Sequence, residues 1–251
     1  MAGIIGLIAA MPQESRALLR RLTGVTRGYL DQLPIDTFSV SSQSCVLVTS
    51  GMGVRRASQA TRGLVDKYDP ILLISFGIGG AVEGDLDIGD VVLVEAFGPL
   101  EQGSPVKLTG LAIWPGLARE AAQQALASRG RHLFSGTAVT TAASHPAVGQ
   151  LTGLAHPVLE METVGIAHVA AQKGIPLLSL RAISDGPHAP IPLDLSTVMD
   201  EDANLKLSGL VNALVHNPLI LLQSRRMLRN ITFATESAAM ALIATLNHWN
   251  D

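Results

Sequence analysis

The sequence has little of several residue types that mark other classes of protein. Its single cysteine, Cys45, cannot form an intramolecular disulfide, and no Cys/His spacing of the zinc type is present. The 18 Lys and Arg residues are outnumbered by 21 Asp and Glu residues, so no basic surplus exists to bind a phosphate backbone. We therefore expect no metal, no nucleic-acid partner and a reduced, cytoplasmic compartment.

Long hydrophobic runs are also missing, although 47% of residues are hydrophobic and the mean hydropathy is +0.33. The apolar run 3–11 is too short for a bilayer and continues into Pro12, which predicts a buried strand. The run 210–222 contains polar residues and Pro218, which predicts an amphipathic segment over a core or pocket, with membrane-surface contact as the alternative. We expect no stable membrane insertion, and a homodimer or higher homo-oligomer that hides apolar surface.

Short aliphatic runs alternate with segments of helical spacing, an order typical of α/β proteins. The 251 residues suit one domain. We predict a single three-layer α/β domain over 1–251, with a central mixed, mostly parallel sheet, a core over 3–186 and a C-terminal helical layer over 194–248. The predicted strands are 3–10, 46–50, 71–77, 91–96 and 176–183, and the predicted helices begin at 13 and 55 or span 117–128 and 164–173. The segment 98–114 is expected to leave the sheet.

Ligands of open α/β sheets bind at the carboxyl ends of the strands, so the residues just after each aliphatic run are the candidates. Glu14 falls in the first turn of a helix after the first strand, where it either serves a site or only favours the helix dipole. Gly51 and Gly53 follow the second run, and glycines between 77 and 80 follow the third. Turn formation is the simpler interpretation of these glycines, and neither group matches a phosphate-binding motif.

Two further candidate places contain charged residues beside apolar runs. Glu160 and Glu162 would point the same way in an extended segment, and two like charges at a buried strand end require a cation, donor or ligand between them. Arg181 lies inside the last strand and needs an anionic partner if it is buried, while Asp185 follows at the carboxyl end. The alternatives are a solvated loop for the two glutamates and surface placement for Arg181 and Asp185.

Taken in order, these blocks resemble the nucleoside phosphorylase/nucleosidase superfamily, and within it the methylthioadenosine/S-adenosylhomocysteine nucleosidases. The matching blocks are Ala10-Met11…Glu14, Ser50-Gly51-Met52-Gly53, Gly77-Ile78-Gly79-Gly80, Ile88-Gly89-Asp90-Val91-Val92, Glu160-Met161-Glu162 and Arg181-Ala182-Ile183-Ser184-Asp185. The stretch 194–246 resembles the hopanoid-biosynthesis-associated phosphorylase subfamily, thought to release adenine from adenosylhopane.

The resemblance implies an adenine nucleosidase that cleaves the N-glycosidic bond of a 5′-substituted adenosine, such as methylthioadenosine, S-adenosylhomocysteine or adenosylhopane, without a cofactor. Asp185 would be the general acid that protonates purine N7, and Glu14 would be the base that activates water. Glu162 would hold the ribose hydroxyls. By the same resemblance, the supporting polar residues are Glu160, Arg181 and Ser184, the residues lining the sugar and 5′-substituent are Met11 and Met161, and the adenine-reading segment is Ala138, Val139 and Thr140.

Three departures from the family pattern keep other functions open. Ile78 stands where the nucleosidases have a serine that helps bind water, and Val139 stands where an aromatic ring usually stacks on the purine. The strand before the glycines lacks the arginine of the phosphorylase branches, which favours hydrolysis, although Arg55 or Arg56 remains available for phosphate. The alternatives are a phosphate-dependent purine nucleoside phosphorylase and a non-catalytic nucleoside-binding protein.

Overall fold

The computed structural model describes residues 3–100, 106–141, 151–188 and 220–249. Its strands are β1 (Ile5–Ala9), β2 (Thr26–Leu30), β3 (Leu33–Val40), β4 (Gln43–Thr49), β5 (Leu72–Ala81), β6 (Val91–Pro99), β7 (Thr109–Gly110), β8 (Leu133–Thr140), β9 (Pro157–Glu160) and β10 (Leu177–Asp185). Its helices are α1 (Pro12–Leu19), α2 (Val54–Tyr68), α3 (Gly116–Ala127), α4 (Thr163–Lys173) and α7 (Ile220–Asn247).

The strands form one mixed sheet in the order β10-β6-β8-β9-β5-β1-β4-β3-β2, with β7 beside β6. Parallel pairing joins β4, β1, β5 and β10, and also joins β6, β8 and β9. Because β10 pairs with both β5 and β6, and β9 pairs with β5, the strands β5, β10, β6, β8 and β9 pair in a closed ring. The end of β5 therefore lies beside the ends of both β9 and β10.

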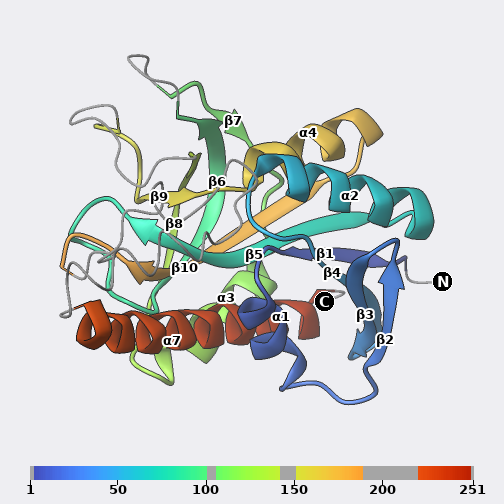
Figure 1. Ribbon diagram of the computed structural model, residues 1–251, viewed down its shortest axis with the longest axis horizontal. Coiled ribbons are helices and arrows are strands. Elements are labelled where there is room, and N and C mark those ends of the chain that lie inside the picture. Colours follow the sequence, from blue (N-terminus) through green and yellow to red (C-terminus); the bar gives the residue numbers. More distant parts are fainter. Residues whose placement is uncertain (1–2, 101–105, 142–150, 189–219, 250–251) are drawn as a thin grey trace.

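Helices cover both faces of the sheet (Figure 1), which confirms the predicted α/β layers. On one face, α1, α3 and α7 bury aliphatic residues against the sheet, including Leu18, Leu126 and Leu242. On the other face, α2 and α4 pack together and bury residues such as Leu64 and Ile166. Removing such side chains from water is the main force that holds the layers together.

The helix ends follow ordinary stereochemical rules. Pro12 occupies the first turn of α1, where its missing N–H costs no hydrogen bond. Gly174 ends α4 with φ +67°, a left-handed conformation that glycine adopts without strain, so the predicted end of this helix is confirmed.

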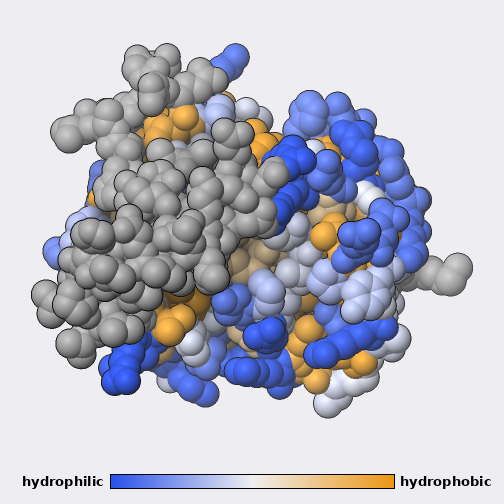
Figure 2. Space-filling model, in the orientation of Figure 1, coloured by the Kyte–Doolittle hydropathy of each residue, from blue (hydrophilic) through white to orange (hydrophobic). Residues whose placement is uncertain are grey.

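Within the described residues, no helix combines the length and apolarity required to cross a bilayer. Outside the grey atoms, the face seen in Figure 2 is largely hydrophilic, with scattered hydrophobic residues.

The structure differs from the sequence predictions in several places. Gly77–Gly80 does not turn but continues β5, because its backbone pairs with β10 on one side and β9 on the other. The hairpin β2–β3 and the strand β8 were not predicted, and the segment 98–114 returns to the sheet at β7. Of the predicted C-terminal helical layer, the described residues contain helix α7, while residues 194–219, including Pro218, lie outside the described residues.

Candidate active site

Glu14 is buried where β1 turns into α1. The residue is 3% exposed, and its Oε2 accepts a hydrogen bond of 2.8 Å from the Met11 N–H. Its Oε1 accepts one of 3.0 Å from the Ile78 N–H in β5. Burial raises the pKa of Glu14, although these N–H groups and Arg181 oppose the shift. The carboxyl is thus fixed at both oxygens and more basic than an exposed glutamate.

Gly77 makes room for this carboxyl. A Cβ at position 77 would overlap Glu14 Oε1 and lie 3.0 Å from its Cδ. The glycine in β5 is therefore required for close approach rather than for a turn.

Arg181 and Glu160 form a buried ion pair beside Glu14. Arg181 Nη2 lies 2.9 Å from Glu160 Oε2, and the two side chains are 2% and 0% exposed. The same Nη2 also contacts Ser75 Oγ at 2.8 Å and Thr163 Oγ1 at 3.0 Å. This arrangement confirms that Arg181 is buried with an anionic partner, and excludes the surface alternative.

Glu160 also caps the start of α4. Its Oε2 accepts hydrogen bonds from the N–H groups of Glu162 and Thr163, at 2.9 and 2.8 Å, and its Oε1 accepts one from the Thr140 hydroxyl. Burial disfavours the charge of Glu160, but Arg181 and these donors outweigh burial and hold its pKa below the usual range. Glu160 is therefore a charged, structural member of the site, at a helix N-terminus that favours an anion.

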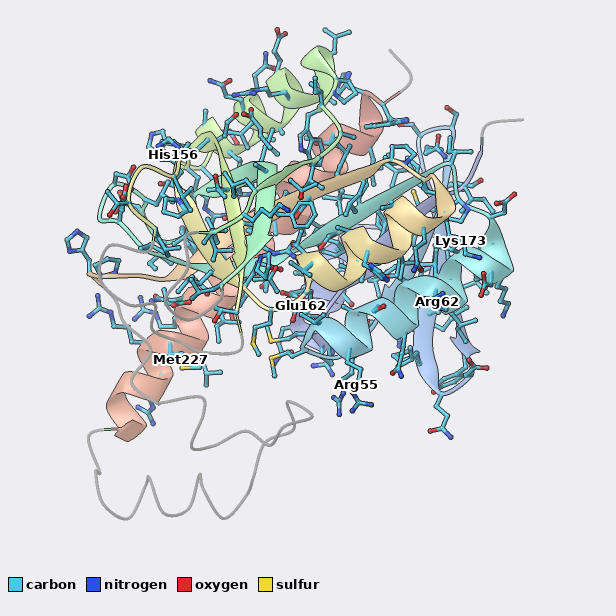
Figure 3. All side chains as sticks on the ribbon, turned by 90° about the horizontal axis from the view of Figure 1, so that it is seen from above. Arg55, Arg62, His156, Glu162, Lys173 and Met227 are labelled. Atoms are coloured by element: carbon cyan, nitrogen blue, oxygen red, sulfur yellow. The ribbon has the colours of Figure 1, made fainter. Side chains whose placement is uncertain are left out.

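Glu162 leaves the strand direction, because β9 ends at Glu160 and Glu162 has φ −127° and ψ −34° at the start of α4. Its Oε1 accepts a hydrogen bond of 2.9 Å from the N–H of Gly53, whose φ of +99° suits glycine. Burial and the nearby charge of Glu160 raise the pKa of Glu162 to about 8. Figure 3 shows Glu162 at the end of α4 that faces the start of α2.

Asp185 lies at a β-bulge that ends β10. The register with β5 shifts between Ile183 and Asp185, so Ser184 is the extra residue. The Ser184 hydroxyl contacts Asp185 Oδ1 at 2.6 Å and the Gly79 carbonyl at 3.3 Å. A Cβ at Gly80 would lie 2.6 Å from Asp185 Oδ2. Burial raises the pKa of Asp185, while the Ser184 hydrogen bond opposes the shift.

A small cavity of about 10 Å³, roughly the space of one water molecule, lies among several of these groups. Its charged lining residues are Glu14, Glu162 and Arg181, and its other lining residues are Ile8, Ala10, Ser75, Phe76, Gly77, Ile78 and Ile166. Typical small-molecule sites occupy about 300–1,000 Å³, so this cavity has the size of a water-binding pocket and not of a whole ligand site. Ile78 gives the cavity an apolar wall next to the Glu14 carboxyl.

The other predicted site residues have varied positions. Met11 and Met161 are partly exposed beside Glu14 and Glu162, respectively, and their N–H groups bond to those carboxyls. Val139, however, is fully buried within β8, whose backbone pairs with β6 and β9.

The rest of the predicted adenine-reading segment has partners within the sheet. Ala138 is also fully buried in β8. The Thr140 hydroxyl bonds to Glu160, and the Thr140 carbonyl accepts a hydrogen bond of 2.8 Å from the Leu100 N–H. The Thr140 hydroxyl therefore connects this segment to the buried pair of Glu160 and Arg181.

Arg55 and Arg56 begin α2, close in sequence to Gly53. Arg55 is exposed, and in Figure 3 its side chain points outward from α2 and away from Glu162. Arg56 packs over Gly51, where a Cβ would lie 3.0 Å from its Cδ. Neither arginine lines the cavity.

Ser75 and Thr163 are members of the site that the sequence analysis missed. Ser75 is a buried hydroxyl in an otherwise aliphatic stretch of β5, and Thr163 directly follows the Glu-Met-Glu block. A buried polar residue in an aliphatic strand requires a partner, which was the available signal for Ser75. In the described part of the chain, no group of three His, Cys, Asp or Glu side chains is arranged to hold a metal ion.

Comparison with known proteins identifies the family. A model described as the phosphorylase superfamily matches residues 4–216. A 5′-methylthioadenosine/S-adenosylhomocysteine nucleosidase of Shewanella oneidensis is 30% identical over 227 residues, which cover 84% of this chain and 93% of the relative. The nucleosidase of Neisseria meningitidis, solved with methylthio-immucillin-A, has a TM-score of 0.70 at 18% identity, covering 97% and 98% of the two chains. That of Colwellia psychrerythraea, solved with adenine, has a TM-score of 0.72 at 16% identity, covering 98% and 95%. With its fold, its buried carboxylates and these matches, the chain belongs to the phosphorylase superfamily.

Proposed function

We propose that this chain is an adenine nucleosidase that hydrolyses the N-glycosidic bond of a 5′-substituted adenosine. Cleavage of this bond passes through a sugar cation that resembles an oxocarbenium ion. The enzyme must protonate the departing base, stabilise the cation and activate water. The similarity to nucleosidases that act on methylthioadenosine and S-adenosylhomocysteine supports this reaction and this class of substrate.

The residue roles follow from the chemical state of each carboxyl. Asp185 is assigned as general acid, because burial raises its pKa and keeps a proton available. Glu14 is assigned as general base, because burial raises its pKa too and its two N–H contacts fix its direction. Glu162 is assigned to the ribose hydroxyls, with Met11 and Met161 beside the sugar.

The observation that carries the proposal is the convergence of Glu14, Glu162 and Arg181 on one cavity. A protein that only bound nucleosides would have no need for buried carboxyls with raised pKa beside this cavity. Gly77 and Gly80, which leave space for Glu14 and Asp185, are three residues apart in β5, about 10 Å along a strand. Both carboxyls therefore lie against the same stretch of β5.

The charges of the cavity favour water over phosphate as nucleophile. Among the residues that line the described cavity, Arg181 is the single cation, and it is already paired with Glu160. A phosphate dianion placed there would face Glu14 and Glu162 without a free positive partner. Of the two alternative phosphate ligands, Arg55 points away from Glu162 (Figure 3), and neither Arg55 nor Arg56 lines the cavity.

The test is adenine release from methylthioadenosine, S-adenosylhomocysteine, adenosine and an adenosyl-lipid, each with and without phosphate. We expect release that is independent of phosphate and that gives the free sugar. Strict phosphate dependence with a sugar 1-phosphate as product would identify a phosphorylase instead. Nucleoside binding without release from any substrate would identify a non-catalytic binding protein. A preference for the adenosyl-lipid would support the hopanoid-associated assignment that 194–246 suggests.

We also propose that the chain forms a homodimer or higher homo-oligomer in the cytoplasm. Among its large apolar side chains, Ile113 is 93% exposed and Leu117 is 52% exposed, and an interface would remove both from water. Light scattering coupled to size-exclusion chromatography tests the assembly. A mass equal to one chain of 26.3 kDa would contradict it.

A further inference from the structure

The Ile88-Gly89-Asp90 block has no part in the reaction described above, yet it touches β10 next to the bulge. The Gly89 N–H donates a hydrogen bond of 2.8 Å to the Ile183 carbonyl. The Ile183 N–H donates one of 2.8 Å to the Asp90 carbonyl. Both backbone groups of Ile183 are therefore fixed two residues before Asp185.

Helix α7 packs directly on this turn. Gly89 has φ +92°, and a Cβ there would lie 2.5 Å from Phe233 Cε1 and 3.2 Å from Ser237 Oγ. Only a glycine permits both the conformation and the contact. Phe233 is still 41% exposed, and the buried apolar residues of α7 are others, such as Ala238 and Leu242.

Arg131 contacts the α7 residues that pack on this turn, and Asp90 accepts hydrogen bonds within and beside the turn. The Arg131 guanidinium lies 3.6 Å from the centroid of the Phe233 ring, and its Nη1 donates a hydrogen bond of 2.7 Å to Ser237 Oγ. The buried Asp90 carboxylate accepts hydrogen bonds from the N–H groups of Asp87 and His132, at 2.9 and 2.8 Å. Arg131 and His132 are consecutive, so one short segment connects α7 to the Asp90 turn.

We infer that these five residues, Gly89, Asp90, Arg131, Phe233 and Ser237, form an anchor cluster that positions the Asp185 carboxyl for proton transfer to the leaving base. The anchor cluster fixes Ile183, the bulge begins at Ile183, and the bulge sets the direction of Ser184 and Asp185. Phe233 and Arg131 are thus positioning residues, which act through the backbone of β10. The inference rests on the proposed function, because it assigns the acid to Asp185.

The variants Phe233→Leu and Arg131→Met test the anchor cluster, and Arg129→Met is the matched control. Arg129 is exposed on the same segment and outside the cluster. Each protein is assayed with methylthioadenosine and with 4-nitrophenyl 5-methylthio-β-D-ribofuranoside, whose leaving group departs without protonation. We expect kcat for methylthioadenosine to fall roughly 10–100-fold, part of the 10²–10⁴ that a positioned acid supplies, with less than about a threefold change for the nitrophenyl riboside. Equal losses with both substrates would mean a general structural role and overturn the inference.

Two further measurements distinguish a positioning role from a general structural defect: the pH profile of kcat/KM and the activity of the conservative variant Arg131→Lys. Burial raises the pKa of Asp185, so looser positioning in the variants should lower that pKa. The high-pH limb of kcat/KM, where the acid loses its proton, should then move to lower pH. Arg131→Lys keeps a cation beside the Phe233 ring and should recover part of kcat. An unmoved limb and no recovery would contradict the positioning role.

Hydrogen–deuterium exchange separates failure of this inference from failure of the proposed function. If the wild-type protein releases neither leaving group, and no adenine from S-adenosylhomocysteine, adenosine or the adenosyl-lipid, the proposed nucleosidase activity is wrong. The anchor cluster still predicts faster exchange of the amides at 183–185 in Phe233→Leu and Arg131→Met than in Arg129→Met. Unchanged exchange in those amides would overturn the inference whatever the activity.

Discussion

Substitution of Gly77 by alanine tests whether the position of the Glu14 carboxyl controls the reaction. The new methyl group would overlap Glu14 Oε1 and lie 3.0 Å from Glu14 Cδ. The backbone of β5 cannot yield easily, because Gly77 pairs with Arg181 in β10. Glu14 must therefore move, and its hydrogen bond with the Ile78 N–H is the first to break.

Two free-energy costs follow from that movement. Extra volume in a packed site costs about 1–3 kcal/mol of stability. Loss of a hydrogen bond to a charged group adds about 1.5–3 kcal/mol, less whatever new contacts the carboxyl makes. A general base supplies about 10²–10⁴ in rate, so we expect kcat to fall by at least about 10²-fold.

The assay measures adenine release and urea-induced unfolding of the same preparations. Gly28→Ala is the control, since Gly28 is also a strand glycine but a Cβ there would meet Ile35 Cγ1 at an ordinary 3.6 Å. We expect wild-type kcat and equal or slightly higher stability for the control. A Gly77→Ala protein with kcat within about threefold of wild type would refute the role given to Glu14.

Three further substitutions probe the other charged groups. Arg181→Met leaves the buried Glu160 unpaired and should lower the free energy of unfolding by about 3–5 kcal/mol in urea titrations; an unchanged midpoint would contradict the buried pair. Asp185→Asn should abolish turnover but keep nucleoside binding within about tenfold by calorimetry, because the acid acts on the leaving base; equal loss of both would remove that role. The pKa of Glu162, raised to about 8, favours the folded protein most below pH 4.5, and this contribution declines as the pH rises to about 8. Glu162→Gln should flatten that decline in unfolding measured from pH 5 to 8, and a parallel decline would refute the shift.

Much of the site could be predicted from the sequence, because a charged side chain next to an aliphatic run needs a partner if it is buried. A buried arginine inside an aliphatic strand requires an anion, and two glutamates at a buried strand end require a cation, donor or ligand. The structure pairs Arg181 with Glu160, whereas Glu162 accepts a hydrogen bond from the Gly53 N–H. The positions of five aliphatic strands, β1, β4, β5, β6 and β10, also followed, since period and apolar content indicate which segments are buried.

The unpredicted features depend on contacts between distant segments. Gly77 and Gly80 resemble turn residues in the sequence, because nothing local shows that Glu14 and Asp185 will occupy the space beside them. The bulge at Ser184 is likewise set by the pairing of β10 with β5. Glu162 does not continue the strand, because Glu160 caps α4 and that helix begins at Thr163, directly after Glu162.

The charge balance of the inner site connects this fold to one class of reaction. Glu160 neutralises Arg181, so the starts of α1 and α4 present Glu14 and Glu162 to the cavity without a second cation among its described lining residues. Such a cavity disfavours an anionic nucleophile and favours a transition state that gains positive charge, because Coulomb interactions are strong away from water. As the sugar of the proposed substrate becomes cationic, it also favours the ionised form of Glu162. The carboxyls that destabilise one another in the free protein are therefore stabilised most when the glycosidic bond breaks.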